Sequence, residues 1–156
     1  MIESEKKTAQ KLYDLLNEIH LILHHSDRQI LAGFELSIPR FYVLHHTYCE
    51  VGLSLQRLSE LTFLDKASIS RMVFDMEREG LIEREVNAKD RRSHSLKLSF
   101  KGLELYQKAH QAFETDLVSR FLPLCQQSVP ELISRLSELN DTLRGHLENI
   151  QKNSSP

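Results

Sequence analysis

The chain contains 156 residues with a formal net charge of −2, and 40% of them are hydrophobic and 27% charged. These proportions are typical of a soluble globular protein of one domain or two small lobes, and the overall charge alone indicates no nucleic-acid partner. No apolar run approaches the roughly 18 residues of a membrane span, and the start MIESEKKTAQ has no apolar signal core. We therefore expect a cytoplasmic protein without membrane contact.

The N-terminal part is predicted to be helical. Apolar residues at helical spacing indicate a first helix over about residues 4–25, with a stripe formed by Leu12, Leu15, Leu16, Ile19, Ile22 and Leu23. The next segment, residues 26–36, fits either an extension of this helix or an irregular loop. A second helix is predicted over Ile38–Glu50, with Ser37 as candidate N-cap and Pro39 in its first turn.

Two amphipathic helices with a short connection follow. The first begins after the candidate N-cap Ser54 and turns three leucines inward: Leu55, Leu58 and Leu61. The second begins after the candidate N-cap Asp65 and ends at Gly80, a residue type typical of the position just after a helix. A connection of about three or four residues is that of a helix-turn-helix motif.

The second of these helices, over Lys66–Glu79, has two distinct faces. Four residues are predicted to face the core: Ile69, Met72, Val73 and Met76. The opposite face contains Ala67, Ser70, Arg71, Phe74 and Arg78, with Ser68 on its flank. Small hydroxyl side chains and an arginine near a helix N-terminus suit the major groove of DNA, because they allow close approach and donate hydrogen bonds. The apolar Phe74 on this face either packs on a thymine methyl group or a sugar, or is covered by neighbouring side chains, and we expect the cover.

The pattern then changes to alternation. LIEREV (81–86) and HSLKL (94–98) predict two strands joined by the basic stretch NAKDRRSHS (87–95). Residues 84–101 contain six Lys or Arg and two Asp or Glu, a net charge of +4 on an otherwise acidic chain. A basic hairpin tip can reach a narrow minor groove, where negative potential is concentrated. Asp90 either holds a neighbouring arginine in position or bonds its own backbone in a turn, and both can hold.

The C-terminal part is again helical. A long helix from about Phe100 is predicted to break near Pro123–Gln127, and the capping box at residues 128–131 starts the last helix. One side of this helix consists of Leu132, Ile133, Leu136, Leu139, Leu143 and Leu147.

We expect a mainly α fold with a small β-hairpin wing, a winged helix-turn-helix core flanked by long N- and C-terminal helices. The apolar stripes of the first and last helices predict a homodimer, which a palindromic DNA site also requires.

The segments LSIPRFYVL (36–44) and LSLQRLSELTFLDKASISRMVFDMEREGLIEREVNAKDRRSHSLKLSFKG (53–102) resemble the core of the MarR (multiple-antibiotic-resistance) family. The most specific element is LDKASISRMV followed by EGLI, the DRR of the wing and LSFKG. The resemblance implies a homodimeric winged-helix regulator, usually a repressor, that ligands or oxidants release from palindromic DNA. It divides the chain into an N-terminal dimerisation helix and its connection (1–35), a DNA-binding domain (36–101) and C-terminal dimerisation helices (102–156).

The same resemblance assigns roles by position. It implies that Ser68, Ser70 and Arg71 contact bases and phosphates, with Arg57 and Lys66 as supporting phosphate contacts. In the wing it implies an acid–x–arginine pair of Asp90 and Arg92, with Arg92 in the minor groove, and the DNA-binding set is completed by Lys89 and Arg91. The sequence departs from the family at Phe74 and Asp75, which stand where the family commonly has polar or basic residues.

A sensor site is the remaining functional expectation. A small-molecule pocket, suited to phenolic or aromatic carboxylate effectors, is implied between the dimer helices and the winged core, with polar groups from His24, Tyr42, His45 and His110. His20 and His24 have the i,i+4 spacing of a metal pair, which leaves a metal-responsive regulator of the same fold open as an alternative. No compact ligand set accompanies them, so no metal or other cofactor is expected. Two cysteines, Cys49 and Cys125, leave redox control open as an alternative.

Other function classes have less support. The sequence has no Gly-rich phosphate loop, nucleophile elbow, paired catalytic carboxylates or zinc-protease motif, so we do not expect an enzyme. A helical interaction module whose winged core binds protein is the alternative from another class. The salt dependence of the binding affinity distinguishes a DNA-binding regulator from a protein-binding module, because DNA binding weakens steeply with salt through counterion release.

Overall fold

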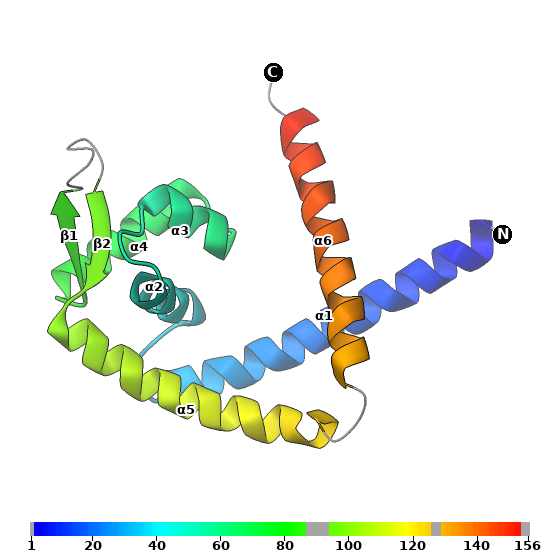
Figure 1. The fold of residues 1–156 in the computed structure, drawn as a ribbon, viewed down its shortest axis with the longest axis horizontal. Helices are drawn as coiled ribbons and strands as arrows, with labels where there is room; N and C mark the ends of the chain where they lie inside the picture. The colour runs from blue at the N-terminus through cyan, green and yellow to red at the C-terminus, as the bar shows by residue number, and fades with distance from the viewer. Residues whose placement is uncertain (1, 87–93, 126–128, 154–156) are drawn as a thin grey trace. The chain divides into compact units, whose positions relative to one another are not determined.

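The computed structural model describes residues 2–86, 94–125 and 129–153 (Figure 1). In chain order the elements are α1 (Ile2–Ala32), α2 (Ile38–Cys49), α3 (Leu55–Thr62), α4 (Lys66–Arg78), β1 (Ile82–Val86), β2 (His94–Leu98), α5 (Phe100–Cys125) and α6 (Val129–Asn153). None of the helices in these residues is both long and apolar enough to cross a membrane. The predicted mainly α fold with a small hairpin is confirmed.

The chain forms two compact units, residues 1–114 and 115–156. The helix α5 belongs to both units, and the predicted division into dimerisation and DNA-binding parts stays a prediction. The first unit contains α1 to β2 and most of α5. It also contains the whole buried core, which consists of Leu31, Leu36, Phe41, Val43, Leu44, Leu53, Leu58, Ile69, Val73, Met76, Leu81, Ile82, Leu96, Tyr106 and Ala109.

The first helix takes the longer of the two forms that the sequence left open. It continues to Ala32, seven residues beyond the expected end, so residues 26–32 extend the helix and only residues 33–37 connect it to α2. Leu31 explains the extension, because its side chain is fully buried in the core. The chain then reverses at Glu35, whose φ of 56° lies in the left-handed region, and the Leu36 N–H donates to the Leu31 carbonyl at 3.1 Å.

The N-caps of the helix-turn-helix lie where the sequence predicts them. Ser54 Oγ accepts from the Arg57 N–H at 3.1 Å and starts α3. Asp65 starts α4, and its carboxylate accepts from both the Ser68 N–H, at 2.9 Å, and the Ser68 hydroxyl, at 2.6 Å. These two bonds hold the pKa of Asp65 below its usual value. Ser37 occupies the N-cap position of α2, but its side chain makes no capping hydrogen bond.

The end of α4 is closed by Gly80. Its φ of 72° is in the left-handed region, where glycine is favoured. The Gly80 N–H donates to the Glu77 carbonyl at 3.0 Å, and the Leu81 N–H donates to the Met76 carbonyl at 2.9 Å. These two bonds form a Schellman motif, which satisfies the last carbonyls of the helix and directs the chain into β1.

The two strands form an antiparallel hairpin in which Ile82 pairs with Leu98 and Arg84 with Leu96. Leu53, just before α3, adds a short bridge, because its carbonyl accepts from the Leu96 N–H at 2.8 Å. The hairpin is therefore attached to the helix-turn-helix as a wing (Figure 1). Its predicted basic tip, residues 87–93, lies outside the described residues.

The last two helices follow the predicted order. The long helix α5 continues through Pro123 to Cys125, although a proline inside a helix removes one backbone hydrogen bond. The final helix begins at Val129, with Pro130 in its first turn. Ser128, the predicted cap of that helix, lies outside the described residues.

Hydrogen bonds of Ser99 connect the start of α5 to the turn that follows α4. Ser99 Oγ accepts from the Gly102 N–H at 2.9 Å and donates to the Gly80 carbonyl at 2.5 Å, and the Ser99 N–H donates to the Leu81 carbonyl at 3.1 Å. The backbone of Gly102 lies so close to the backbone of Leu81 that a Cβ atom on residue 102 would be 2.0 Å from the Leu81 carbonyl oxygen. Only glycine fits at this position.

Replacing Gly102 with alanine is expected to lower the free energy of unfolding by roughly 1–3 kcal/mol, because backbone atoms must move to admit the methyl group. Urea unfolding followed by circular dichroism measures the change. Gly145→Ala is the matched control: among the described residues, nothing beyond its own helical neighbours would lie within 4 Å of the added methyl group, so alanine should leave stability unchanged or raise it. Equal stability of Gly102→Ala and the unmodified protein would contradict the close packing.

Candidate nucleic-acid interface

The two faces of α4 lie as the sequence predicts. Ile69, Val73 and Met76 are buried in the core, and Met72 packs against it. The opposite side, which we call the outer face of α4, is exposed and consists of Ala67, Ser68, Ser70, Arg71, Phe74 and Arg78. These six residues include two arginines and two hydroxyl groups, which can donate hydrogen bonds to an acceptor-rich partner, and the exposed Asp75 lies beside Arg71 and Ser68.

Phe74 corrects one expectation. The sequence predicted that neighbouring side chains would cover it, but 52% of its surface is exposed. Its neighbours one turn away on the outer face are Ser70, which is too short to shield a ring, and Arg78, whose guanidinium carbon lies 5.9 Å from the ring centroid.

The acidic residues near the end of α4 are largely paired. Glu77 forms an ion pair with Arg84 of β1 at 3.1 Å, and Glu79 forms one with Arg40 of α2. Within the described residues, neither Lys66 nor Arg71 has a carboxylate partner. Both side chains are therefore available to an anionic partner, although the exposed Asp75 adds a negative charge one turn after Arg71.

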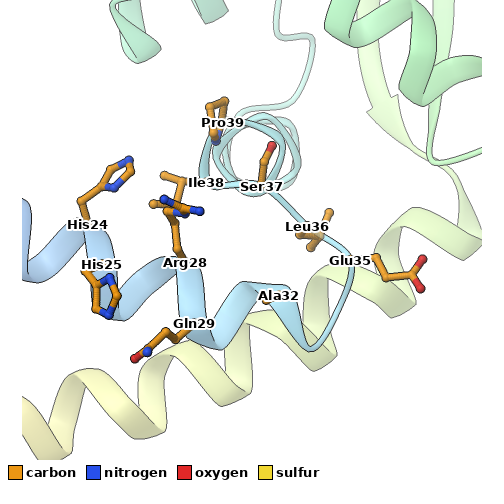
Figure 2. A pocket seen from close by; sticks show the side chains of 10 residues that line it. All are labelled: His24, His25, Arg28, Gln29, Ala32, Glu35, Leu36, Ser37, Ile38 and Pro39. Atoms are coloured by element: carbon orange, nitrogen blue, oxygen red, sulfur yellow. The ribbon is translucent and has the colours of Figure 1, made fainter.

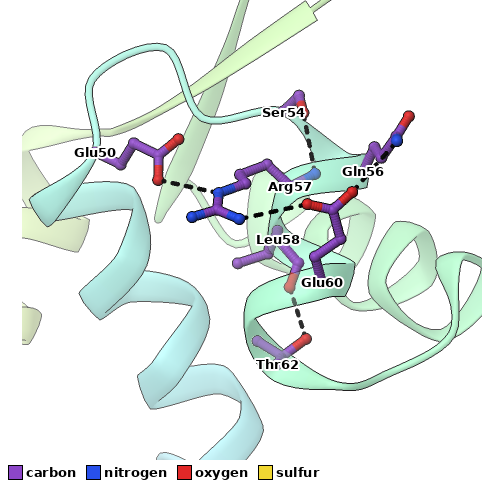
Figure 3. Close-up of polar contacts among 7 residues, drawn as sticks. All are labelled: Glu50, Ser54, Gln56, Arg57, Leu58, Glu60 and Thr62. Atoms are coloured by element: carbon purple, nitrogen blue, oxygen red, sulfur yellow. Dashed lines mark hydrogen bonds and ion pairs between the residues drawn. The ribbon is translucent and has the colours of Figure 1, made fainter. Parts of the chain in front are cut away.

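Arg57 has a different environment from the other predicted contacts. Its guanidinium lies 3.6 Å from a Glu50 carboxylate oxygen and 3.4 Å from one of Glu60, and Figure 3 shows both pairs beside the Ser54 cap. These side chains are about half exposed, and exposed pairs of this kind are worth about 1 kcal/mol or less. A phosphate can therefore replace either carboxylate at little cost.

The strands of the wing contain fewer free positive charges than the sequence count suggests. Lys97 pairs with Glu83 at 3.2 Å and with Glu85 at 2.5 Å, and hydrogen bonds to these carboxylates raise the pKa of Lys97. Arg84 is paired with Glu77, and the Lys101 ammonium donates to the Glu79 carbonyl at 2.9 Å. The four wing residues predicted to contact DNA lie outside the described residues: Lys89, Asp90, Arg91 and Arg92.

Of the four predicted effector residues, His24 lines a pocket of the first unit. A pocket of about 590 Å³ lies where α1 meets α2, and its walls are His24, His25, Arg28, Gln29, Ala32, Glu35, Leu36, Ser37, Ile38 and Pro39 (Figure 2). Of the predicted set it contains only His24. Sequence reasoning missed Arg28 and Ser37, because this pocket depends on the helical extension of α1 and on the reversal at Glu35, neither of which has a clear local signal.

His45 and His110 belong instead to an aromatic cluster, formed by Phe41, His45, Tyr48, Tyr106, His110 and Phe113. Tyr106 is almost fully buried, and its hydroxyl shares a 3.0 Å hydrogen bond with His45 Nδ1. Burial, together with nearby Cys49, Tyr48 and Glu114, raises the pKa of Tyr106 to about 12. The Tyr42 ring contacts Phe41 of this cluster edge-on, with ring centroids 6.0 Å apart, and stacks on His46 at 6.1 Å.

The pKa of His45 is lowered by burial and then by His46 and His110. The unfolded chain therefore takes up this proton at a higher pH than the folded chain, so stability should fall as pH drops below about 6.5. We expect thermal unfolding temperatures to decrease from about pH 7.5 to about pH 5.5. The decrease should be smaller in His45→Gln, and equal decreases in both proteins would contradict this account.

The remaining sensor candidates are two histidines of α1 and the two cysteines. His20 and His24 lie on one side of α1, with ring centroids 5.8 Å apart. Cys49 is exposed, with its sulfur 3.8 Å from His45 Nε2, and Cys125 is exposed on α5. Within the described residues, no group of three or more His, Cys, Asp or Glu side chains is placed to hold a metal ion.

Comparisons with known proteins agree with this arrangement. The MarR family model matches residues 34–93. The chain is 27% identical over 139 residues to the organic hydroperoxide resistance transcriptional regulator of Bacillus subtilis, which covers 83% of this chain and 91% of that protein. It is 26% identical over 114 residues to the multiple antibiotic resistance protein MarR of Escherichia coli, covering 67% and 79%.

Solved structures show the same fold. AbsC, a MarR family transcriptional regulator from Streptomyces coelicolor, superposes with a TM-score of 0.79 at 24% identity, over 91% of this chain and 95% of that one. MepR of S. aureus, solved as a DNA complex, superposes with a TM-score of 0.75 at 19% identity, over 83% and 94%. Residues 34–93 therefore match the MarR family model, and the longer chain is similar in sequence and in fold to MarR-family winged helix-turn-helix transcriptional regulators.

Proposed function

We propose that the protein is a homodimeric, sequence-specific DNA-binding repressor that acts in the cytoplasm by binding rather than by catalysis. The outer face of α4 would enter the major groove, with Ser68, Ser70 and Arg71 contacting bases and phosphates. The observation that supports this most is that Lys66 and Arg71, both exposed in the first two turns of α4, have no carboxylate partner within the described residues. Lys89, Asp90, Arg91 and Arg92 of the wing would contact the neighbouring minor groove and its phosphates.

The exposed apolar stripes support the homodimer. On α1, Leu12, Leu15, Ile19 and Ile22 are between 44% and 58% exposed, and on α6 the exposed residues include Leu132, Ile133, Leu136, Leu143 and Leu147. Regular apolar stripes on long helices are usually buried against a partner. Two-fold symmetry would also place two copies of α4 about one DNA turn apart.

The pocket between α1 and α2 supports release by a small molecule. Its volume is in the range of ligand sites, and the side chains of Arg28, His24 and His25 in its wall offer donors to an anionic group. An aromatic carboxylate or phenol fits this chemistry. Titrating the protein–DNA complex with sodium benzoate and with phenol, and following dissociation by fluorescence anisotropy, tests this part of the proposal.

Selection from a random DNA library tests the DNA-binding proposal itself. The protein should enrich an inverted repeat whose half-sites are about 10 base pairs apart, because a dimer presents two recognition helices at that spacing. A library that shows no enriched sequence at low salt would overturn the proposal.

A further inference from the structure

Phe74 is the one large hydrophobic side chain left exposed on α4, a helix that the structure describes from end to end. It is half exposed on the same side as Ser70 and Arg71, one helical turn further from the N-terminus. The apolar stripes that support dimerisation lie on α1 and α6 and do not include it. An isolated apolar ring within a basic, hydroxyl-rich face requires a partner that is mostly polar but has a small apolar group.

DNA contains one such group in the major groove, the C5-methyl of thymine, which distinguishes thymine from the other three bases. We propose that Phe74 contacts the C5-methyl group of one thymine in each half-site and makes the protein prefer thymine there. This inference rests on the proposed DNA-binding function.

Arg78 supports this role. Its guanidinium carbon lies 5.9 Å from the centroid of the Phe74 ring, a distance at which a cation is attracted to an aromatic face. The contact restricts the ring at the surface, and it leaves the guanidinium group free to approach a backbone phosphate. The opposite side of the helix is fixed by buried Val73 and Met76, so the ring cannot turn inward to the core.

The test uses the duplex enriched from the random library, with each thymine replaced in turn by deoxyuridine. This replacement removes only the methyl group and keeps base pairing. For the unmodified protein, one position in each half-site should lose about fourfold in affinity, the effect of burying one methyl-sized group. Phe74→Ala should bind thymine and deoxyuridine duplexes equally, and Phe74→Leu should keep part of the difference.

Phe100→Ala is the matched control, since Phe100 is 80% exposed and lies at the start of α5 rather than on α4. It should show the same thymine dependence as the unmodified protein. If Phe74→Ala retains the full thymine dependence, or if no thymine position matters to the unmodified protein although it binds tightly, the inference is wrong. Failure of the unmodified protein to bind any duplex would instead overturn the proposed function, and the inference with it.

Discussion

Replacing Arg71 with alanine is expected to weaken binding to the enriched duplex by about five- to a hundredfold, which corresponds to roughly 1–3 kcal/mol for one arginine that contacts a base. Arg71 lies in the second turn of α4 on its outer face and has no carboxylate partner within the described residues. Its guanidinium is therefore available to a base edge or a phosphate. Fluorescence anisotropy at a fixed salt concentration measures the loss.

Lys108→Ala controls for the loss of one positive charge. Lys108 is on α5, 69% of its side chain is exposed, and it lies near Glu104, away from the helix-turn-helix in sequence. Its replacement should change affinity by less than about twofold, since rim charges contribute little. If Arg71→Ala and Lys108→Ala bind DNA equally well, the outer face of α4 is not the DNA-binding surface.

Replacing Leu136 with aspartate is expected to convert the dimer to a monomer or an unfolded chain at micromolar concentration. Leu136 lies in the middle of the α6 stripe and is 47% exposed in the single chain. In a dimer interface the new carboxylate would be buried without a partner, at a cost of roughly 3 kcal/mol or more per site. Light scattering coupled to gel filtration measures the mass.

Ser134→Asp is the control on the same helix. Ser134 is exposed and lies on the side of α6 opposite the stripe, so the same new charge should leave the dimer intact. A monomeric mass for the unmodified protein, or an unchanged dimer in Leu136→Asp, would contradict the use of this stripe in dimerisation.

Local chemistry made much of the DNA-binding unit predictable. Asp65 and Gly80 delimit α4 through hydrogen bonds that involve only near neighbours in the chain, so the sequence alone indicates both ends. The spacing of Ile69, Val73 and Met76 determines the buried face, and the outer face follows from it. The alternation after Gly80 similarly predicted both strands to within one residue.

Features that depend on distant contacts were left open or missed. The burial of Leu31 against other elements stabilises the extension of α1, one of the two alternatives that residues 26–36 left open. The ion pairs of Arg84 with Glu77 and of Lys97 with Glu83 join separate elements, so a count of charges overestimated the free positive charge of the strands. The pocket beside Arg28 requires the left-handed backbone of Glu35, a conformation that a glutamate does not signal.

The most direct test of the account is the salt dependence of binding to the DNA upstream of the protein's own gene, or to the enriched duplex, for the unmodified protein and for Arg92→Ala of the wing. The logarithm of the affinity should fall linearly with the logarithm of the salt concentration, by about 0.9 for each phosphate neutralised, and Arg92→Ala should bind more weakly with a shallower slope. Binding that is indifferent to salt, or equal in the two proteins, would contradict DNA recognition by the wing and would favour a protein partner for the winged core.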